Sequence, residues 1–102
     1  MKVFISQPMA GKTTDEIKLE KDGIINEIKS LYPDAEIIDS FVTEQPKEDC
    51  TNVSLWYLGQ SLIFLSKSDV AYFAEGWSKN RGCKIEHDAA VAYGIPIVRK
   101  AG

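Results

Sequence analysis

The apolar positions of this chain follow two patterns that alternate along its length. Short apolar runs are typical of strands that are buried on both faces of a parallel sheet. Longer stretches with apolar residues every three or four positions are typical of helices. The short runs predict strands over residues 2–6, 35–39, 69–74 and 95–98, and the longer stretches predict helices over residues 13–32, 52–66 and 82–93.

Several residues support these boundaries. Thr13 and Glu16 have the spacing of a capping box, in which two side chains satisfy backbone amides at a helix start. Gly94 suits the position just after a helix, where a left-handed conformation is common. Pro96, near the start of the last run, suits an edge strand because proline has no amide hydrogen to donate.

The expected elements alternate in the order β-α-β-α-β-α-β with short connections. This order predicts a parallel sheet that is covered by helices on both faces. Because crossovers between parallel strands are right-handed, we expect a flavodoxin- or Rossmann-like three-layer α/β sandwich with four or five strands in the order 2-1-3-4. Residues 1–102 are expected to form a single domain, since no linker or repeat interrupts them.

The predicted helix over residues 52–66 is apolar on all sides, with Trp56, Tyr57 and Phe64 among its large side chains. A helix of this kind is usually covered on more than one side. In so small a chain, the second cover is expected to be another subunit. The pattern therefore predicts a homo-oligomer that forms through this helix.

Composition and charge exclude several classes of protein. Apolar residues make up 44% and charged residues 26% of the chain, as in an average globular domain. A net charge of −3 without a basic stripe argues against a nucleic acid polymer as partner. The longest weakly charged stretch is too polar to span a membrane, and the first residues lack a signal-peptide design, so we expect a cytoplasmic protein with no membrane partner. Cys50, Cys83 and the single histidine cannot make a zinc site, so no metal is expected.

Open parallel sheets bind ligands beyond the carboxyl ends of their strands, at the point where the strand order reverses. In the order 2-1-3-4 this point lies between the first and third strands, beside the loops over residues 6–12 and 75–82. The first loop ends in Gly11-Lys12, as a phosphate-binding P-loop does. However, Ser6 stands where that motif requires glycine and Pro8 removes a backbone donor, so we interpret the loop as a turn at the wall of a ligand pocket.

Glu86 is the main candidate for catalysis. In the predicted helix it shares a face with Gly82, Ala89, Ala90 and Tyr93, and small residues on that face suit close packing on a sheet. A carboxylate there points toward the crevice between the first and third strands. Burial of an unpaired carboxylate is costly or raises its pKa, so a compensating group is expected. The structural alternatives are stabilisation by the helix dipole or a salt bridge to a nearby basic residue, Arg81 or Lys79.

The loop before this helix offers further candidate contacts. Trp77 either packs as a lid or stacks on a base or sugar. The neighbouring polar residues are either solvated or form a phosphate site beside a helix N-terminus. His87 and Asp88 are expected to be solvated on other faces. These polar candidates are Ser78, Lys79, Asn80 and Arg81.

Two blocks of the chain resemble a known family. Residues 3–12, Val-Phe-Ile-Ser-Gln-Pro-Met-Ala-Gly-Lys, resemble the "YISGPMTGK" opening of small phage and bacterial proteins in the nucleoside 2-deoxyribosyltransferase-like superfamily. Residues 68–96 resemble its second block, an aspartate-led strand, a loop, and then Gly-x3-Glu-x3-Ala-x3-Gly-x-Pro from Gly82 to Pro96. Together the blocks cover about 40 of the 102 residues, in the order expected for the family.

The resemblance implies a flavodoxin-like homo-oligomer that cleaves the N-glycosidic bond of deoxynucleosides or their 5′-monophosphates without a metal or organic cofactor. Its catalytic glutamate aligns with Glu86, which would attack the anomeric carbon and form a covalent intermediate. The strand-leading aspartate aligns with Asp69, which helps to position the base or the nucleophile and is a candidate to protonate the leaving base. Phe4 aligns with an aromatic residue that is often tyrosine, and Gln7 replaces a common glycine.

Three hypotheses follow. The first is a nucleoside or nucleotide N-glycosidase or deoxyribosyltransferase with Glu86 and Asp69 as catalytic residues, and a basic residue near the pocket favours a 5′-monophosphate. The second is a binding module that senses a nucleotide without turnover. The third is a structural protein in which the 52–66 helix forms an oligomer interface. The expected substrate contacts are Phe4, Ser6, Gln7, Pro8, Met9, Gly76, Trp77, Ser78, Lys79, Asn80, Arg81 and Gly82.

Overall fold

Parallel strands form the centre of the fold in the computed structural model, which describes residues 1–40 and 42–102. The described elements are β1 (Lys2–Ser6), α1 (Thr14–Leu31), β2 (Glu36–Ile37), α2 (Val53–Ser66), β3 (Val70–Phe73), the 3-10 turn η1 (Trp77–Lys79), α3 (Arg81–Ala92) and β4 (Ile97–Arg99). The four strands pair in the order β2-β1-β3-β4, and every pairing is parallel. The predicted strand order and the flavodoxin- or Rossmann-like α/β class are confirmed.

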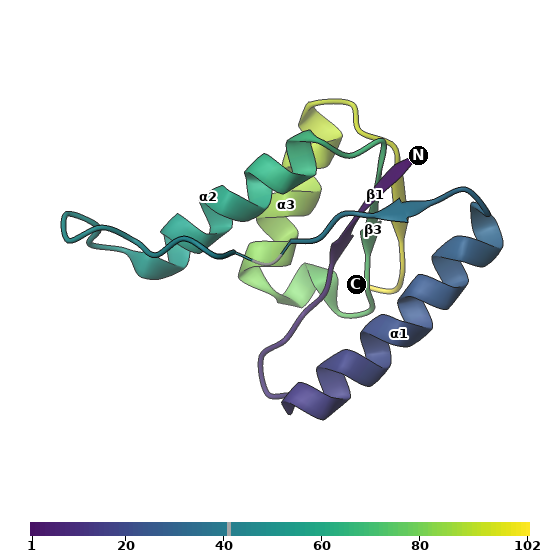
Figure 1. Cartoon of the computed structure of the whole chain (residues 1–102), viewed down its shortest axis with the longest axis horizontal. Coiled ribbons are helices and arrows are strands. Elements are labelled where there is room, and N and C mark those ends of the chain that lie inside the picture. The colour runs from purple at the N-terminus through teal and green to yellow at the C-terminus, as the bar shows by residue number, and fades with distance from the viewer. Residues whose placement is uncertain (41) are drawn as a thin grey trace.

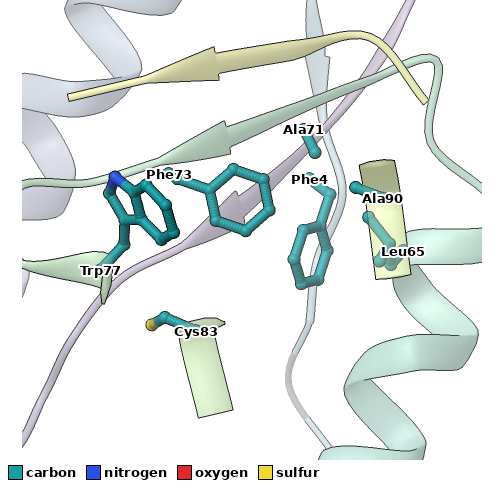
Figure 2. Packing of buried hydrophobic residues seen from close by; sticks show 7 residues of the cluster. All are labelled: Phe4, Leu65, Ala71, Phe73, Trp77, Cys83 and Ala90. Atoms are coloured by element: carbon teal, nitrogen blue, oxygen red, sulfur yellow. The ribbon is translucent and has the colours of Figure 1, made fainter. Parts of the chain in front are cut away.

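Helices lie on both faces of this sheet. α1 covers one face, whereas α2 and α3 lie side by side on the other (Figure 1). Side chains along a strand point alternately to the two faces, so β1 and β3 contribute to a core on each side. Figure 2 shows the core on the α2 and α3 side, which contains Phe4, Leu65, Ala71, Phe73, Trp77, Cys83 and Ala90. The core on the α1 side contains Val3, Ile24, Ile28, Val70, Tyr72 and Ala74.

The strands differ from their predicted ranges at the edges of the sheet. β2 is restricted to Glu36–Ile37 instead of residues 35–39, and β3 is shorter by one residue at each end than predicted. β4 runs over Ile97–Arg99 instead of residues 95–98. Pro96 precedes β4 and contributes only its carbonyl, which accepts a 2.9 Å hydrogen bond from Ala71 N. Because proline has no amide hydrogen, the strand begins after it.

The predicted helix ends lie within a residue of the observed ones. The Thr13 side chain accepts a 3.1 Å hydrogen bond from Glu16 N and caps α1. Asn52 and Asn80 cap α2 and α3 in the same way, at 2.9 and 3.0 Å. Gly94 follows α3 with a φ of 74°, which confirms the left-handed position predicted for it.

Within the described residues, no helix combines the length and the apolar character that crossing a bilayer requires. No group of three or more His, Cys, Asp or Glu side chains in residues 1–40 and 42–102 is arranged to hold a metal ion. The polar segment over residues 40–49, which contains Pro46, is expected from the sequence to form a loop, and residue 41 within it lies outside the described residues.

Candidate functional site

A pocket of about 340 Å³ lies at the carboxyl end of β1, between the loop that follows this strand and the helices α2 and α3. This is the point of the sheet where the strand order reverses, as the topology predicts. Its walls are formed by Phe4, Ile5, Ser6, Gln7, Met9, Ala10, Ser40, Ser54, Tyr57, Leu58, Ser61, Asn80, Gly82, Cys83 and Glu86.

Glu86 provides the carboxylate of this pocket and is only 7% exposed. The Ser6 hydroxyl donates a 2.7 Å hydrogen bond to Glu86 Oε1, and the Ser61 hydroxyl is a second hydrogen-bond partner. Burial raises the pKa of the Glu86 carboxyl above its ordinary value, and the hydrogen bonds from Ser6 and Ser61 act in the opposite direction. Hydroxyl groups therefore compensate this carboxylate, in place of the salt bridge with Arg81 or Lys79 that the sequence left open.

Local structure explains why the two ends of this hydrogen bond meet. Ser6 is the last residue of β1 and pairs with Phe73 of β3, so its side chain stands at the rim of the sheet. Asn80 fixes the start of α3, and Glu86 follows in the second turn. Ala90 lies one turn further along the same face and is fully buried, which holds that face of α3 close to the strands.

The other polar groups of the pocket carry no positive charge. Four serines and Tyr57 offer hydroxyl groups, and Gln7 and Asn80 offer amides. Cys83 lines the pocket as well, and burial raises the pKa of its thiol, while a hydrogen bond with Ser6 opposes this rise. Glu86 is thus the charged group of a wall in which neutral donors and acceptors alternate with apolar side chains such as Phe4 and Leu58. This arrangement suits an uncharged ligand part with both hydroxyl groups and apolar faces, such as a sugar.

The loop after β1 is held by α1. The amide nitrogen Nε2 of Gln7 donates to Ile17 O at 3.0 Å and to Glu20 Oε1 at 2.8 Å. Lys12 Nζ lies 3.1 Å from both carboxylate oxygens of Glu20. Lys12 is therefore paired within the fold, in agreement with the interpretation that this loop is not a P-loop. Gln7 Oε1 is buried and has no hydrogen-bond partner in the described part of the chain.

A second hollow of about 470 Å³ adjoins the pocket and shares Ser54, Leu58 and Gly82 with it. Arg81 lines this second hollow, beside the first residues of α2 and α3. Arg81 is exposed, so its guanidinium is accessible to a ligand anion. Of the polar loop residues predicted to bind phosphate, Asn80 lines the pocket and Arg81 the hollow, whereas Ser78 and Lys79 line neither.

Trp77 packs in the core and is not part of the pocket wall, so the structure places it as a packing residue, the first of the two roles considered for it. Its ring stacks on His87 with centroids 4.0 Å apart, and its Nε1 donates to Lys100 O at 2.8 Å. Figure 2 shows the indole beside Phe73, inside the core. Pro8 and Gly76 also stay outside the pocket wall.

His87 is buried, contrary to the expectation that it is solvated; only Asp88 is exposed as predicted. Arg99 Nη1 lies 2.8 Å from His87 Nε2, and Asp88 Oδ1 lies 3.1 Å from His87 Nδ1. Because arginine can only donate, His87 Nε2 is the acceptor of this contact. Stacking with Trp77 was not visible in the sequence, and it explains why this face of α3 is covered.

Asp69 lies at the opposite end of the sheet from Glu86. Its Oδ2 accepts a 2.7 Å hydrogen bond from the backbone amide of Lys2, the first residue of β1. Ser6 is four residues further along that strand, a span of about 13 Å. Asp69 therefore secures the alignment of β1 with β3, and the structure does not bring it to the pocket with the other predicted catalytic residue.

Sequence reasoning missed the contribution of α2 to this pocket. Ser54, Tyr57 and Ser61 line the wall and recur at helical spacing, so they share one face of α2. A signal was present, since polar residues at this spacing are unusual within an otherwise apolar helix. Ile5, Ala10, Ser40, Leu58 and Cys83 are the remaining wall residues that were not predicted.

No protein-family model, no curated protein and no solved structure matches this chain.

Proposed function

We propose that this protein cleaves the N-glycosidic bond of a deoxynucleoside or its 5′-monophosphate, by hydrolysis or by transfer, with Glu86 as the nucleophile. The observation that carries the proposal is the buried Glu86 carboxylate, which is held by Ser6 in a pocket of about 340 Å³. The sequence blocks that resemble the nucleoside 2-deoxyribosyltransferase-like superfamily support the same assignment, because the glutamate of their motif is Glu86.

The proposed reaction proceeds in two balanced steps. A Glu86 oxygen attacks the anomeric carbon while the bond to the base breaks, and the bonding electrons leave with the base nitrogen, which takes a proton from water. The resulting glycosyl ester on Glu86 is then attacked by water or by the N–H nitrogen of a second base, whose proton goes to the hydroxide left by the first step, and the carboxylate is restored. The anomeric carbon carries positive charge between these bonds, and a carboxylate in a low-dielectric wall stabilises that charge.

The sugar and the phosphate of a nucleotide would bind in different places, the sugar in the pocket and the phosphate in the adjoining hollow. The neutral hydroxyl and amide groups around Glu86 suit the sugar, and Arg81 in the adjoining hollow suits a 5′-phosphate. The sequence-based preference for a 5′-monophosphate is retained as part of the proposal, with Arg81 as its basic residue.

The experiment is an assay for free base with a panel of deoxynucleosides and their 5′-monophosphates. We expect release from at least one member, loss of release by at least 100-fold in Glu86→Gln, and wild-type rates in Asp88→Asn. Asp88 is the matched control because it is a carboxylate on the same helix that is exposed and paired with Lys84. Release that is equal in wild type and Glu86→Gln, or absent for the whole panel, contradicts the proposal.

A second candidate is a module that binds a nucleotide without turnover, and one observation favours it. Burial raises the pKa of Glu86 and so disfavours the charged carboxylate, which is the form that a nucleophile requires. This candidate predicts a rise in melting temperature with a panel member and no free base. If free base appears at a rate that depends on Glu86, the binding module is excluded.

A further inference from the structure

Cys83 is a pocket residue that the proposed reaction does not use. It lies in the first turn of α3, three residues before Glu86, so the two side chains share one face of the helix. Cys83 is 5% exposed and lines the same pocket as Glu86. Its thiol also forms a hydrogen bond with Ser6, the residue whose hydroxyl holds the carboxylate. Cys83 is therefore one hydrogen bond away from the direct partner of Glu86.

The Ser6 hydroxyl has one hydrogen to donate and two neighbours that could receive it. It donates to Glu86 Oε1 at 2.7 Å. An ionised carboxylate can only accept, so the hydrogen of Ser6 is directed at Glu86 whenever Glu86 is charged. The hydrogen bond between Ser6 and Cys83 then runs in the other direction, from the thiol to the Ser6 oxygen.

The thiol of Cys83 can supply a hydrogen to Ser6 at neutral pH. Burial raises the pKa of this thiol above its ordinary value, and the negative charge of Glu86 acts in the same direction. The hydrogen bond with Ser6 and the charge of Lys12 oppose the rise without cancelling it. Cys83 therefore keeps its proton at neutral pH and is a weak hydrogen-bond donor.

We propose that Cys83 is a positioning residue for Glu86, because its S–H group donates to Ser6 and so directs the single hydroxyl hydrogen of Ser6 at the carboxylate. The three groups form a chain of hydrogen bonds from Cys83 through Ser6 to Glu86. Hydrogen bonds in a chain polarise one another, which strengthens the bond that Glu86 receives. The chain favours the ionised carboxylate, the form that a nucleophile requires. The effect on base release rests on the proposed function, whereas the order of the hydrogen bonds does not.

The alternative role for Cys83 is that of a small apolar residue that only fills space in the core beside α3 (Figure 2). Packing requires volume at this position, whereas the chain of hydrogen bonds requires a donor. Alanine and serine have nearly the same volume and only serine is a donor, so Cys83→Ala and Cys83→Ser are a matched pair. Cys83→Val and Cys83→Thr are a second pair that differs in the same way and fills more of the space.

The first test measures the titration of Glu86 without any substrate. The carboxyl carbon is followed by NMR in protein with isotope-labelled glutamate, and its signal is the one that Glu86→Gln removes. We expect a higher pKa of Glu86 in Cys83→Ala than in Cys83→Ser, because serine restores the donor. Cys50→Ala, which removes the other free thiol, should titrate as the wild type does. Equal titration of the two members in each pair that circular dichroism shows to be folded overturns the proposal.

The second test uses the assay for free base. The acid limb of the pH profile of kcat/KM reports the ionisation of the free enzyme. On this limb we expect base release by Cys83→Ala to be about twofold slower than by Cys83→Ser. Equal rates of release at every pH overturn the proposed effect on catalysis. If no member of the panel releases base, the proposed function fails, and the titration of Glu86 still decides whether Cys83 directs the hydrogen of Ser6.

Discussion

Ser6 and Glu86 are separated by 80 positions in the chain, and the hydroxyl of the first donates a 2.7 Å hydrogen bond to Oε1 of the second. Both side chains are more than nine-tenths buried. The bond joins the end of β1 to the second turn of α3, on either side of the pocket. It favours the ionised form of the carboxylate that burial disfavours. The relationship therefore links the fold to the chemistry proposed for the site.

Replacement of this hydroxyl is expected to impair the nucleophile. A hydrogen bond to a charged group contributes about 1.5–3 kcal/mol, which corresponds to roughly 10- to 100-fold in rate. Ser6→Ala should lower kcat for base release by about this factor and move the acid limb of the pH profile to higher pH, because the pKa of Glu86 rises further. Ser78→Ala, outside the pocket wall, should change neither. An unchanged pH profile in a folded Ser6→Ala variant would contradict the role of this bond.

Glu86→Gln is expected to stabilise the fold near neutral pH. The folded-state pKa of Glu86 is raised, so the folded protein holds this proton in a pH range where the unfolded chain has lost it. Stability of the wild type therefore falls as pH rises from the ordinary glutamate value, about 4.3, through the raised value. The Gln variant should be more stable by about 1 kcal/mol at pH 7, with the difference lost below pH 4.

Urea unfolding at several pH values measures this difference. Asp88→Asn provides a control of opposite sign, because hydrogen bonds from Lys84 and His87 hold the pKa of Asp88 below its ordinary value. That variant should lose stability at neutral pH relative to wild type. A Glu86→Gln variant that is less stable than wild type at pH 7 would be inconsistent with the burial of an ionisable carboxylate.

Arg81→Ala should separate nucleotides from nucleosides. Arg81 lines the hollow that adjoins the pocket, and no basic residue lines the pocket itself. We expect KM for the 5′-monophosphate to rise about fivefold while KM for the matching nucleoside is unchanged, since loss of one exposed charge contact costs about 1 kcal/mol. Lys79→Ala is the matched control, as a basic residue of the same loop outside the hollow. Equal effects of Arg81→Ala on both substrates would show that the phosphate lies elsewhere.

Asp69→Asn is expected to affect stability and not catalysis. Asp69 accepts a hydrogen bond from Lys2 N at the amino end of the sheet, so weakening it should cost about 1 kcal/mol of unfolding free energy. The rate of base release per folded molecule should match the wild type. A large loss of kcat with unchanged stability would instead place Asp69 in catalysis, as the sequence resemblance implies.

The parts of the fold that the sequence predicts are those governed by local rules. The apolar runs, the Thr13 cap and the Gly94 turn lead to the element order, and the handedness of crossovers then leads to the sheet order. The position of the pocket at the carboxyl end of β1 follows from that order. The parallel strand order also places Asp69 at the amino end of the sheet, away from the pocket, because a residue that precedes a parallel strand lies opposite to the carboxyl ends.

The missed features depend on contacts between distant segments. The spacing of Ser54 and Ser61 indicates that they share one face of α2, but an apolar helix does not reveal whether that face turns toward the pocket. Burial of His87 requires the stacking partner Trp77 and the donor Arg99, which come from other elements. The sequence shows each of these residues, but only the fold brings them together.

The most direct test of Glu86 as nucleophile is the mass of the protein during turnover of a substrate that releases base. Wild-type protein in excess over substrate is quenched in acid at successive times, digested and weighed by mass spectrometry. We expect a transient sugar adduct on the peptide that contains Glu86, which forms as base appears and is absent in Glu86→Gln. A sugar attached to a different side chain, or base release without any adduct at every quench time, would contradict it.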